Sequence, residues 1–112
     1  MDKIQRCVET LIEEIRQGET YQRYICCEKK LHEHPELLKQ IDEMRTAAYR
    51  LHNGEGNGDI YVQIEQYEQK FGEYRKNPLV NEFLEAELDV CKMMQKIGTR
   101  IQGGVAIRIP KV

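Results

Sequence analysis

The chain has 112 residues, of which 40% are hydrophobic and 32% are charged, and its formal net charge is −2. This length suits one domain with a modest core, and the mixture is typical of a helical protein with charged outer faces rather than of a disordered chain. The 17 basic and 19 acidic residues form no basic block, and no apolar run approaches the roughly 20 residues of a membrane span, so neither direct nucleic-acid binding nor a membrane association is predicted.

Residues 2–17 predict an amphipathic helix. Its apolar side chains recur at helical spacing, at Ile4, Val8, Leu11, Ile12 and Ile15. Gly18 then interrupts the pattern, and Glu19-Thr20 can open a second helix that extends to about His32. The inner face of this second helix is expected to hold Tyr21, Tyr24, Leu31 and either Ile25 or Cys27.

The next two apolar patterns predict a pair of helices joined as a hairpin. Pro35 suits the first turn of a third helix, whose apolar positions step by four and three: Leu37, Ile41, Met44, Ala48 and Leu51. After the glycine-rich stretch NGEGNG at residues 53–58, the same stepping returns at Ile60, Ile64, Tyr67, Phe71 and Tyr74. Both patterns indicate nearly antiparallel helix packing, and the short loop favours an antiparallel pair.

The last helix begins with Asn77 as the N-cap and Pro78 at the first helical position. One of its seams contains Leu79, Phe83, Ala86, Val90, Met93 and Ile97. A second seam, shifted by one residue, contains Val80, Leu84, Cys91, Met94 and Ile101. Two adjacent seams are wider than one partner helix covers. The helix is therefore either central among the others or half-covered by another subunit, and we favour a homo-oligomer.

The sequence thus predicts an all-α fold: a bundle of about five helices in antiparallel hairpins, with a long C-terminal helix. The predicted oligomer interface consists of eight apolar residues of that helix: Leu79, Val80, Phe83, Leu84, Val90, Met93, Met94 and Ile97. Residues 1–102 are expected to form one domain, which Gly103-Gly104 terminates. Residues 103–112 are expected to form a C-terminal tail, in which VAIRIPKV alternates like a short edge strand or remains extended, with a frayed terminus as the alternative.

Three segments resemble the YlbF/YmcA family of small helical bacterial proteins. They are LIEEIRQGETYQRY (residues 11–24), KKLHEHPELLKQIDEMR (residues 29–45) and EYRKNPLVNEFLEAELDV (residues 73–90). The resemblance covers about residues 4–102 and rests on packing and capping patterns rather than on a catalytic signature. It identifies the chain as a member of this family.

The resemblance implies a self-associating regulator that works through other proteins and is not an enzyme. Relatives regulate competence, sporulation and biofilm formation, in a complex linked to messenger-RNA processing. Some members of that complex hold iron–sulfur clusters through cysteines in C-terminal extensions. This chain has no cysteine after Cys91, so no cofactor is expected, and no small-molecule substrate is predicted.

The stretch CCEKKLHEH at residues 26–34 gathers two cysteines and two histidines. On one helix these side chains point in different directions, and adjacent cysteines cannot imitate a Cys-x-x-Cys knuckle. We therefore predict no metal site. The alternative function is a metal- or redox-sensing protein that combines Cys26, Cys27 and the histidines across a subunit interface.

Three other side chains interrupt or complete the apolar faces. Glu87 breaks the second seam of the last helix, where it either pairs with a basic residue across an interface or lies at the edge in water. Cys7 and Cys91 lie on apolar faces and are expected to be small core residues. No secretory signal is recognisable at the N-terminus, so we expect reduced thiols in a cytoplasmic protein.

Overall fold

The computed structural model describes residues 2–54, 58–105 and 107, and in this part of the chain all regular structure is helical. The helices are α1 (Lys3–Gln17), α2 (Glu19–His32), α3 (Pro35–His52), α4 (Ile60–Arg75) and α5 (Pro78–Gly104). The predicted all-α fold with a long C-terminal helix is therefore confirmed. Most of the predicted tail, at residue 106 and residues 108–112, lies outside the described residues.

The helix ends follow local signals in the sequence. The Asp2 carboxylate accepts a hydrogen bond from the backbone N–H of Gln5 at 2.8 Å, and the Asn77 side chain accepts one from the N–H of Leu79 at 3.0 Å. Such caps satisfy N–H groups that the first turn leaves without partners. Pro35 occupies the first turn of α3, as predicted.

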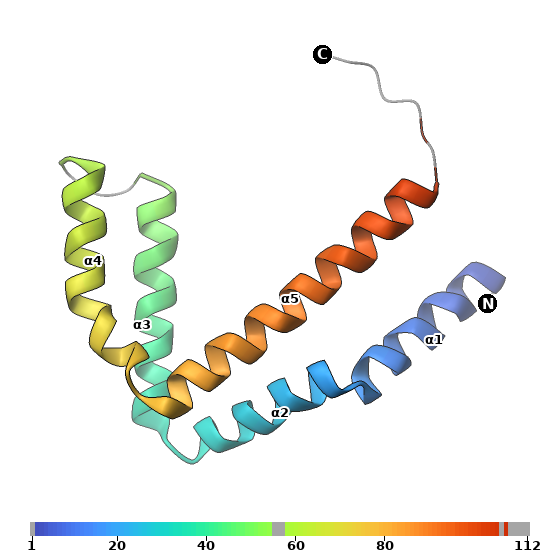
Figure 1. Cartoon of the computed structure of the whole chain (residues 1–112), viewed down its shortest axis with the longest axis horizontal. Helices are drawn as coiled ribbons and strands as arrows, with labels where there is room; N and C mark the ends of the chain where they lie inside the picture. The colour runs from blue at the N-terminus through green and yellow to red at the C-terminus, as the bar shows by residue number, and fades with distance from the viewer. Residues whose placement is uncertain (1, 55–57, 106, 108–112) are drawn as a thin grey trace.

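The helices form a flat, forked arrangement (Figure 1). The hairpin of α3 and α4 makes one arm, while α2 and α5 run side by side in opposite directions. The chain bends at Gly18, between α1 and the N-terminal end of α2. As a result, α1 extends away from α2 and runs roughly along the second half of α5. The extents of the molecule are 49 × 45 × 20 Å.

The core lies where α2, α3 and α5 meet. One cluster of buried side chains joins these three helices: Cys27, Leu31, Leu37, Ile41, Val80, Phe83 and Ala86. Met44 of α3 and Phe71 of α4 are also buried. Burial of a large apolar side chain stabilises a fold by roughly 1.5–3 kcal/mol, so this junction is where most of the chain's packing energy arises.

The chain exposes more surface than a compact monomer of its size. Its accessible surface is 9342 Å², whereas a compact protein of 13.2 kDa exposes about 6,400 Å². Its radius of gyration is 18.7 Å, against about 13 Å for a compact domain of this length. Among the described residues, no helix combines the length and the apolarity needed to cross a membrane.

Candidate interaction surfaces

The first half of α5 is covered by the chain's own helices. Val80 and Phe83 are buried in the core cluster, at 0% and 4% exposure. Leu79 and Leu84 pack against the same cluster and are partly buried. Four of the eight predicted interface residues therefore already have partners within the chain.

The second half of α5 continues the same apolar seams without such a cover. Val90, Met93 and Ile97 are half-buried, while Met94 and Ile101 are 51% and 54% exposed. Beyond Leu84, the second predicted seam is thus exposed, at Cys91, Met94 and Ile101.

No residue of α1 is fully buried: Leu11, Ile12 and Ile15 of its apolar stripe are half-buried, and the first part of the stripe is exposed. Ile4 and Val8 on this stripe are 76% and 48% exposed. The stripe and Ile101 of α5 line an open, largely apolar pocket of about 310 Å³, whose residues are Lys3, Ile4, Cys7, Val8, Leu11 and Ile101. An amphipathic helix in water normally packs its apolar face against another element. We call the exposed apolar side chains of these two elements the α1–α5 apolar surface: Ile4, Val8, Leu88, Met94 and Ile101.

Glu87 is paired within the chain rather than across an interface or with water alone. Its carboxylate accepts a hydrogen bond from the guanidinium of Arg45 on α3. The same guanidinium lies 5.6 Å from the centre of the Phe83 ring, at cation–π distance. Arg45 thus joins α3 to α5 at the edge of the core, and no spacing in the sequence had indicated this residue.

Tyr24 lies beside this ion pair. Its ring is 5.4 Å from that of Phe83. Partial burial raises the pKa of its hydroxyl above the usual 10.0, and the hydrogen bond and charge of Glu28 and the charge of Glu87 raise this pKa further, while Arg45 lowers it. The hydroxyl therefore stays neutral to a higher pH in the folded chain.

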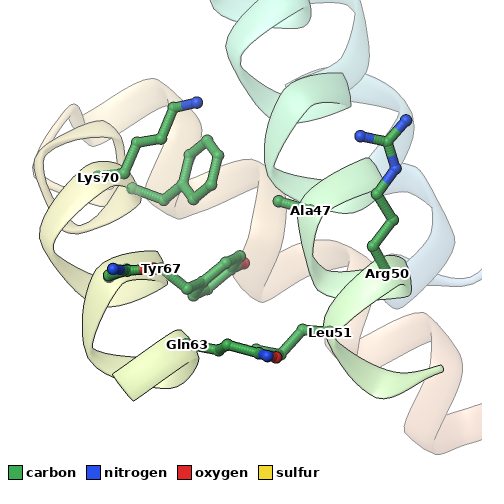
Figure 2. Close-up of a pocket in the computed structure, with 8 residues that line it drawn as sticks. Ala47, Arg50, Leu51, Gln63, Tyr67 and Lys70 are labelled. Carbon is green, nitrogen blue, oxygen red and sulfur yellow. The ribbon is translucent and has the colours of Figure 1, made fainter. Parts of the chain in front are cut away.

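A groove between α3 and α4 has an apolar floor and cationic sides. It has a volume of about 310 Å³ and is lined by Ala47, Arg50, Leu51, Gln63, Gln66, Tyr67, Lys70 and Phe71. Figure 2 shows the Tyr67 ring directed towards α3, with Lys70 and Arg50 on opposite sides of the groove. An aromatic floor between two cations suits an acidic segment with an apolar side chain. The predicted seam had indicated the floor but not the two cations.

The structure does not bring the cysteines and histidines of residues 26–34 together as one site. Cys26 is exposed and Cys27 is buried. The His32 side chain is exposed and lies near Glu28, and the His34 side chain is half-exposed and lies near Glu36. Among the described residues, no group of three or more histidine, cysteine or acidic side chains could hold a metal ion. The alternative of a metal- or redox-sensing protein would require ligands from two subunits, and metal analysis of anaerobically purified protein tests it.

The expectation that Cys7 and Cys91 are core residues is wrong for the single chain. Both thiols are exposed. Each lies on an apolar helix face, as predicted, but the chain's own helices do not cover that part of α1 or α5.

These features define a class: a small, all-helical protein with a limited core and uncovered apolar helix faces. The chain belongs to the YlbF/YmcA family, because a family model described as "Control of competence regulator ComK, YlbF/YmcA" matches residues 4–106. This match confirms the resemblance found in the sequence and indicates a regulatory role with protein partners. Comparison with curated proteins and with solved structures gives no significant match.

Proposed function

We propose that this protein is a cytoplasmic regulatory adaptor that self-associates and acts through protein–protein contacts rather than by catalysis. The description of its family names control of the competence regulator ComK. The resemblance extends the proposal to sporulation, biofilm formation and messenger-RNA processing. Residues 1–102 are the proposed working domain, and residues 103–112 are its tail.

The α1–α5 apolar surface is the observation that carries this proposal. The accessible surface of the chain exceeds that of a compact monomer by roughly 2,900 Å². One partner in a standard protein–protein interface buries about 800 Å². This excess belongs to the chain as a whole; its part on α1 and the second half of α5 includes exposed apolar side chains, and uncovered apolar faces are typical of sites that bind other proteins.

Of the eight predicted interface residues, the four in the second half of α5 carry this part of the proposal. They are Val90, Met93, Met94 and Ile97. Leu79, Val80, Phe83 and Leu84 support the interface from within the core, because they fix the position of the helix that presents the other four.

The regulatory role is tested in the native host. We expect deletion of the coding sequence to change competence, measured as transformation frequency, and the wild-type protein to restore it. Met94→Glu should fail to restore it, whereas Arg100→Glu, on the charged side of the same helix, should succeed. Equal rescue by the two variants would contradict a role for this surface.

Self-association is tested separately on the purified protein. We expect light scattering at tens of micromolar to give at least twice the 13.2 kDa mass of the chain. A monomer at that concentration would overturn the oligomer without bearing on contacts with other proteins. An affinity pull-down from the native host, with Met94→Glu beside Arg100→Glu as bait, tests those contacts.

A further inference from the structure

The groove between α3 and α4 has a floor that the packing of the hairpin holds in place. Phe71 is 3% exposed, and its ring lies 4.9 Å from that of Tyr67, so two aromatic rings support each other at the base. Ala47 lies opposite them on α3 (Figure 2) and fills little space, because its side chain is a single methyl group. The volume of about 310 Å³ above this floor has room for one large apolar side chain.

Two cations flank the floor, one from each helix. Lys70 and Arg50 lie on opposite sides of the groove (Figure 2). The Lys70 ammonium lies 5.2 Å from the centre of the Phe71 ring, and this cation–π contact holds it beside the floor. Among the residues that the structure describes, no carboxylate lies at ion-pair distance from either cation. The groove therefore combines an apolar floor with two positive charges that are available to an anionic partner.

An adjoining hollow limits how much negative charge the groove can accept. It shares Arg50 and Lys70 with the groove and adds Lys39, Asp42 and Glu43 of α3. The two hollows together thus contain three cations and two carboxylates, with the positive excess at Arg50 and Lys70. A ligand with a few carboxylates suits this balance, whereas a long polyanion would also meet the two acidic side chains.

We propose that the groove between α3 and α4 binds a short acidic segment of another protein, with one aromatic side chain on the floor and carboxylates at Arg50 and Lys70. This inference rests on the proposed function, because it gives the adaptor a second surface for protein contacts. The hairpin of α3 and α4 forms one arm of the molecule, and α1 and the second half of α5 lie in the other (Figure 1). A partner on one arm therefore does not cover the other, and the chain can hold two proteins together.

The pattern of charges favours a peptide over a nucleic acid as the occupant. A nucleic-acid backbone carries a negative charge on every nucleotide and is bound along a track of cations. Here Asp42 and Glu43 interrupt such a track beside Arg50, and the formal net charge of the chain is −2. An acidic peptide can place its few carboxylates at the two cations and its apolar side chain between them.

Titration of the full-length protein with a defined peptide tests this site. The probe is acetyl-GDEFEDG-amide, in which one phenylalanine lies between acidic residues. We expect binding in isothermal titration calorimetry that weakens as salt is added, with the largest backbone NMR shifts at residues 47–51 and 63–71. Replacing the phenylalanine by alanine, or the acids by their amides, should each raise the dissociation constant by about fivefold or more. The absence of binding, or shifts centred on α1 and α5, would overturn the proposal.

Variants of the protein test the roles of the cations and of the floor. Arg50→Glu and Lys70→Glu should each raise the dissociation constant of the peptide by about tenfold, because each replaces an attraction by a repulsion. Arg100→Glu is the matched reversal on α5 and should leave the dissociation constant nearly unchanged. Ala47→Leu fills the floor without a change in charge and should also weaken binding. Circular dichroism checks that every variant keeps its helices, and equal effects of Arg50→Glu and Arg100→Glu would contradict the proposed site.

Two further outcomes would identify a different occupant and overturn the proposal. A single-stranded RNA oligonucleotide that binds the groove more tightly than the peptide would indicate a nucleic acid. A lower mass of the Lys70→Glu variant than of the wild type in light scattering would indicate a second copy of the chain. In either case, and if no peptide binds, the proposed function is judged separately, because the Met94→Glu test concerns α5 and not the hairpin of α3 and α4.

Discussion

At the scale of single residues, Arg45 links two kinds of interaction at the edge of the core. Its guanidinium binds the Glu87 carboxylate and lies over the Phe83 ring. Arginine suits this position because its planar group can bind a carboxylate and stack on an aromatic ring at once. Glu87 therefore interrupts the apolar seam of α5 in order to hold α3 against it.

Glu87→Gln should lower the free energy of unfolding by about 1 kcal/mol, because the amide keeps the shape of the side chain but removes its charge. Chemical denaturation measures this change. Glu73→Gln is the matched control, since it breaks the highly exposed pair with Lys76 and should leave the free energy of unfolding nearly unchanged, because water screens such a pair. Equal effects of the two substitutions would show that Arg45 does not hold Glu87 in the way described.

The raised pKa of Tyr24 predicts a loss of stability at alkaline pH. Below pH 10 the hydroxyl is protonated in both the folded and the unfolded chain. Above 10.0, its usual pKa, the unfolded chain loses the proton first, so the free energy of unfolding falls until the pH passes the folded pKa. Tyr24→Phe should make this alkaline decline shallower.

The measurement is a series of urea denaturation curves between pH 8 and 11. Tyr49→Phe serves as the comparison, because it removes the hydroxyl of a highly exposed tyrosine. An alkaline decline of the same slope in Tyr24→Phe and in the wild type would refute the assignment.

At the scale of elements, the sequence predicted the helices well because local signals mark their ends. Gly18, Pro35 and the Asn77-Pro78 pair act through their own backbone geometry, which needs no tertiary context. The partners of each apolar seam could not be predicted in the same way. Arg45 and Glu87 lie far apart in the chain, and only the packing of α3 on α5 brings them together. For the same reason, the sequence did not reveal that Val80 is covered while Met94 is not.

Gly72 offers a test of helix propensity in α4. A Cβ atom added there would meet nothing within 4 Å, so Gly72→Ala should raise the free energy of unfolding by roughly 0.5–1 kcal/mol. Gly54 is the contrasting position, since its φ of +67° lies in the left-handed region. Gly54→Ala should lower stability by about 1 kcal/mol. Thermal denaturation of both variants tests these two expectations. Shifts of the melting temperature in the same direction would contradict them.

At the scale of the whole molecule, a small core supports two long uncovered elements. The buried cluster lies at one end of α5, whereas α1 and the second half of the same helix extend away from it (Figure 1). The sequence had suggested this imbalance through the width of the apolar face of α5. It could not predict that the first part of the α1 stripe, at Ile4 and Val8, is exposed, because periodicity shows which face is apolar and not what covers it.

Val8→Glu tests whether the stripe of α1 belongs to the same interface as α5. Val8 lines the cavity shared with Ile101, so a carboxylate there should raise the dissociation constant of the dimer by about tenfold, because burial of an unpaired charge is unfavourable. Since α1 buries no residue within the chain, the fold of a single chain should be unaffected. Thr10→Glu adds the same charge on the opposite face of α1, where the Thr10 hydroxyl donates to the Arg6 carbonyl at 2.9 Å, and should leave the dissociation constant unchanged. Light scattering over a concentration series compares the two variants, and equal dissociation constants would place α1 outside the interface.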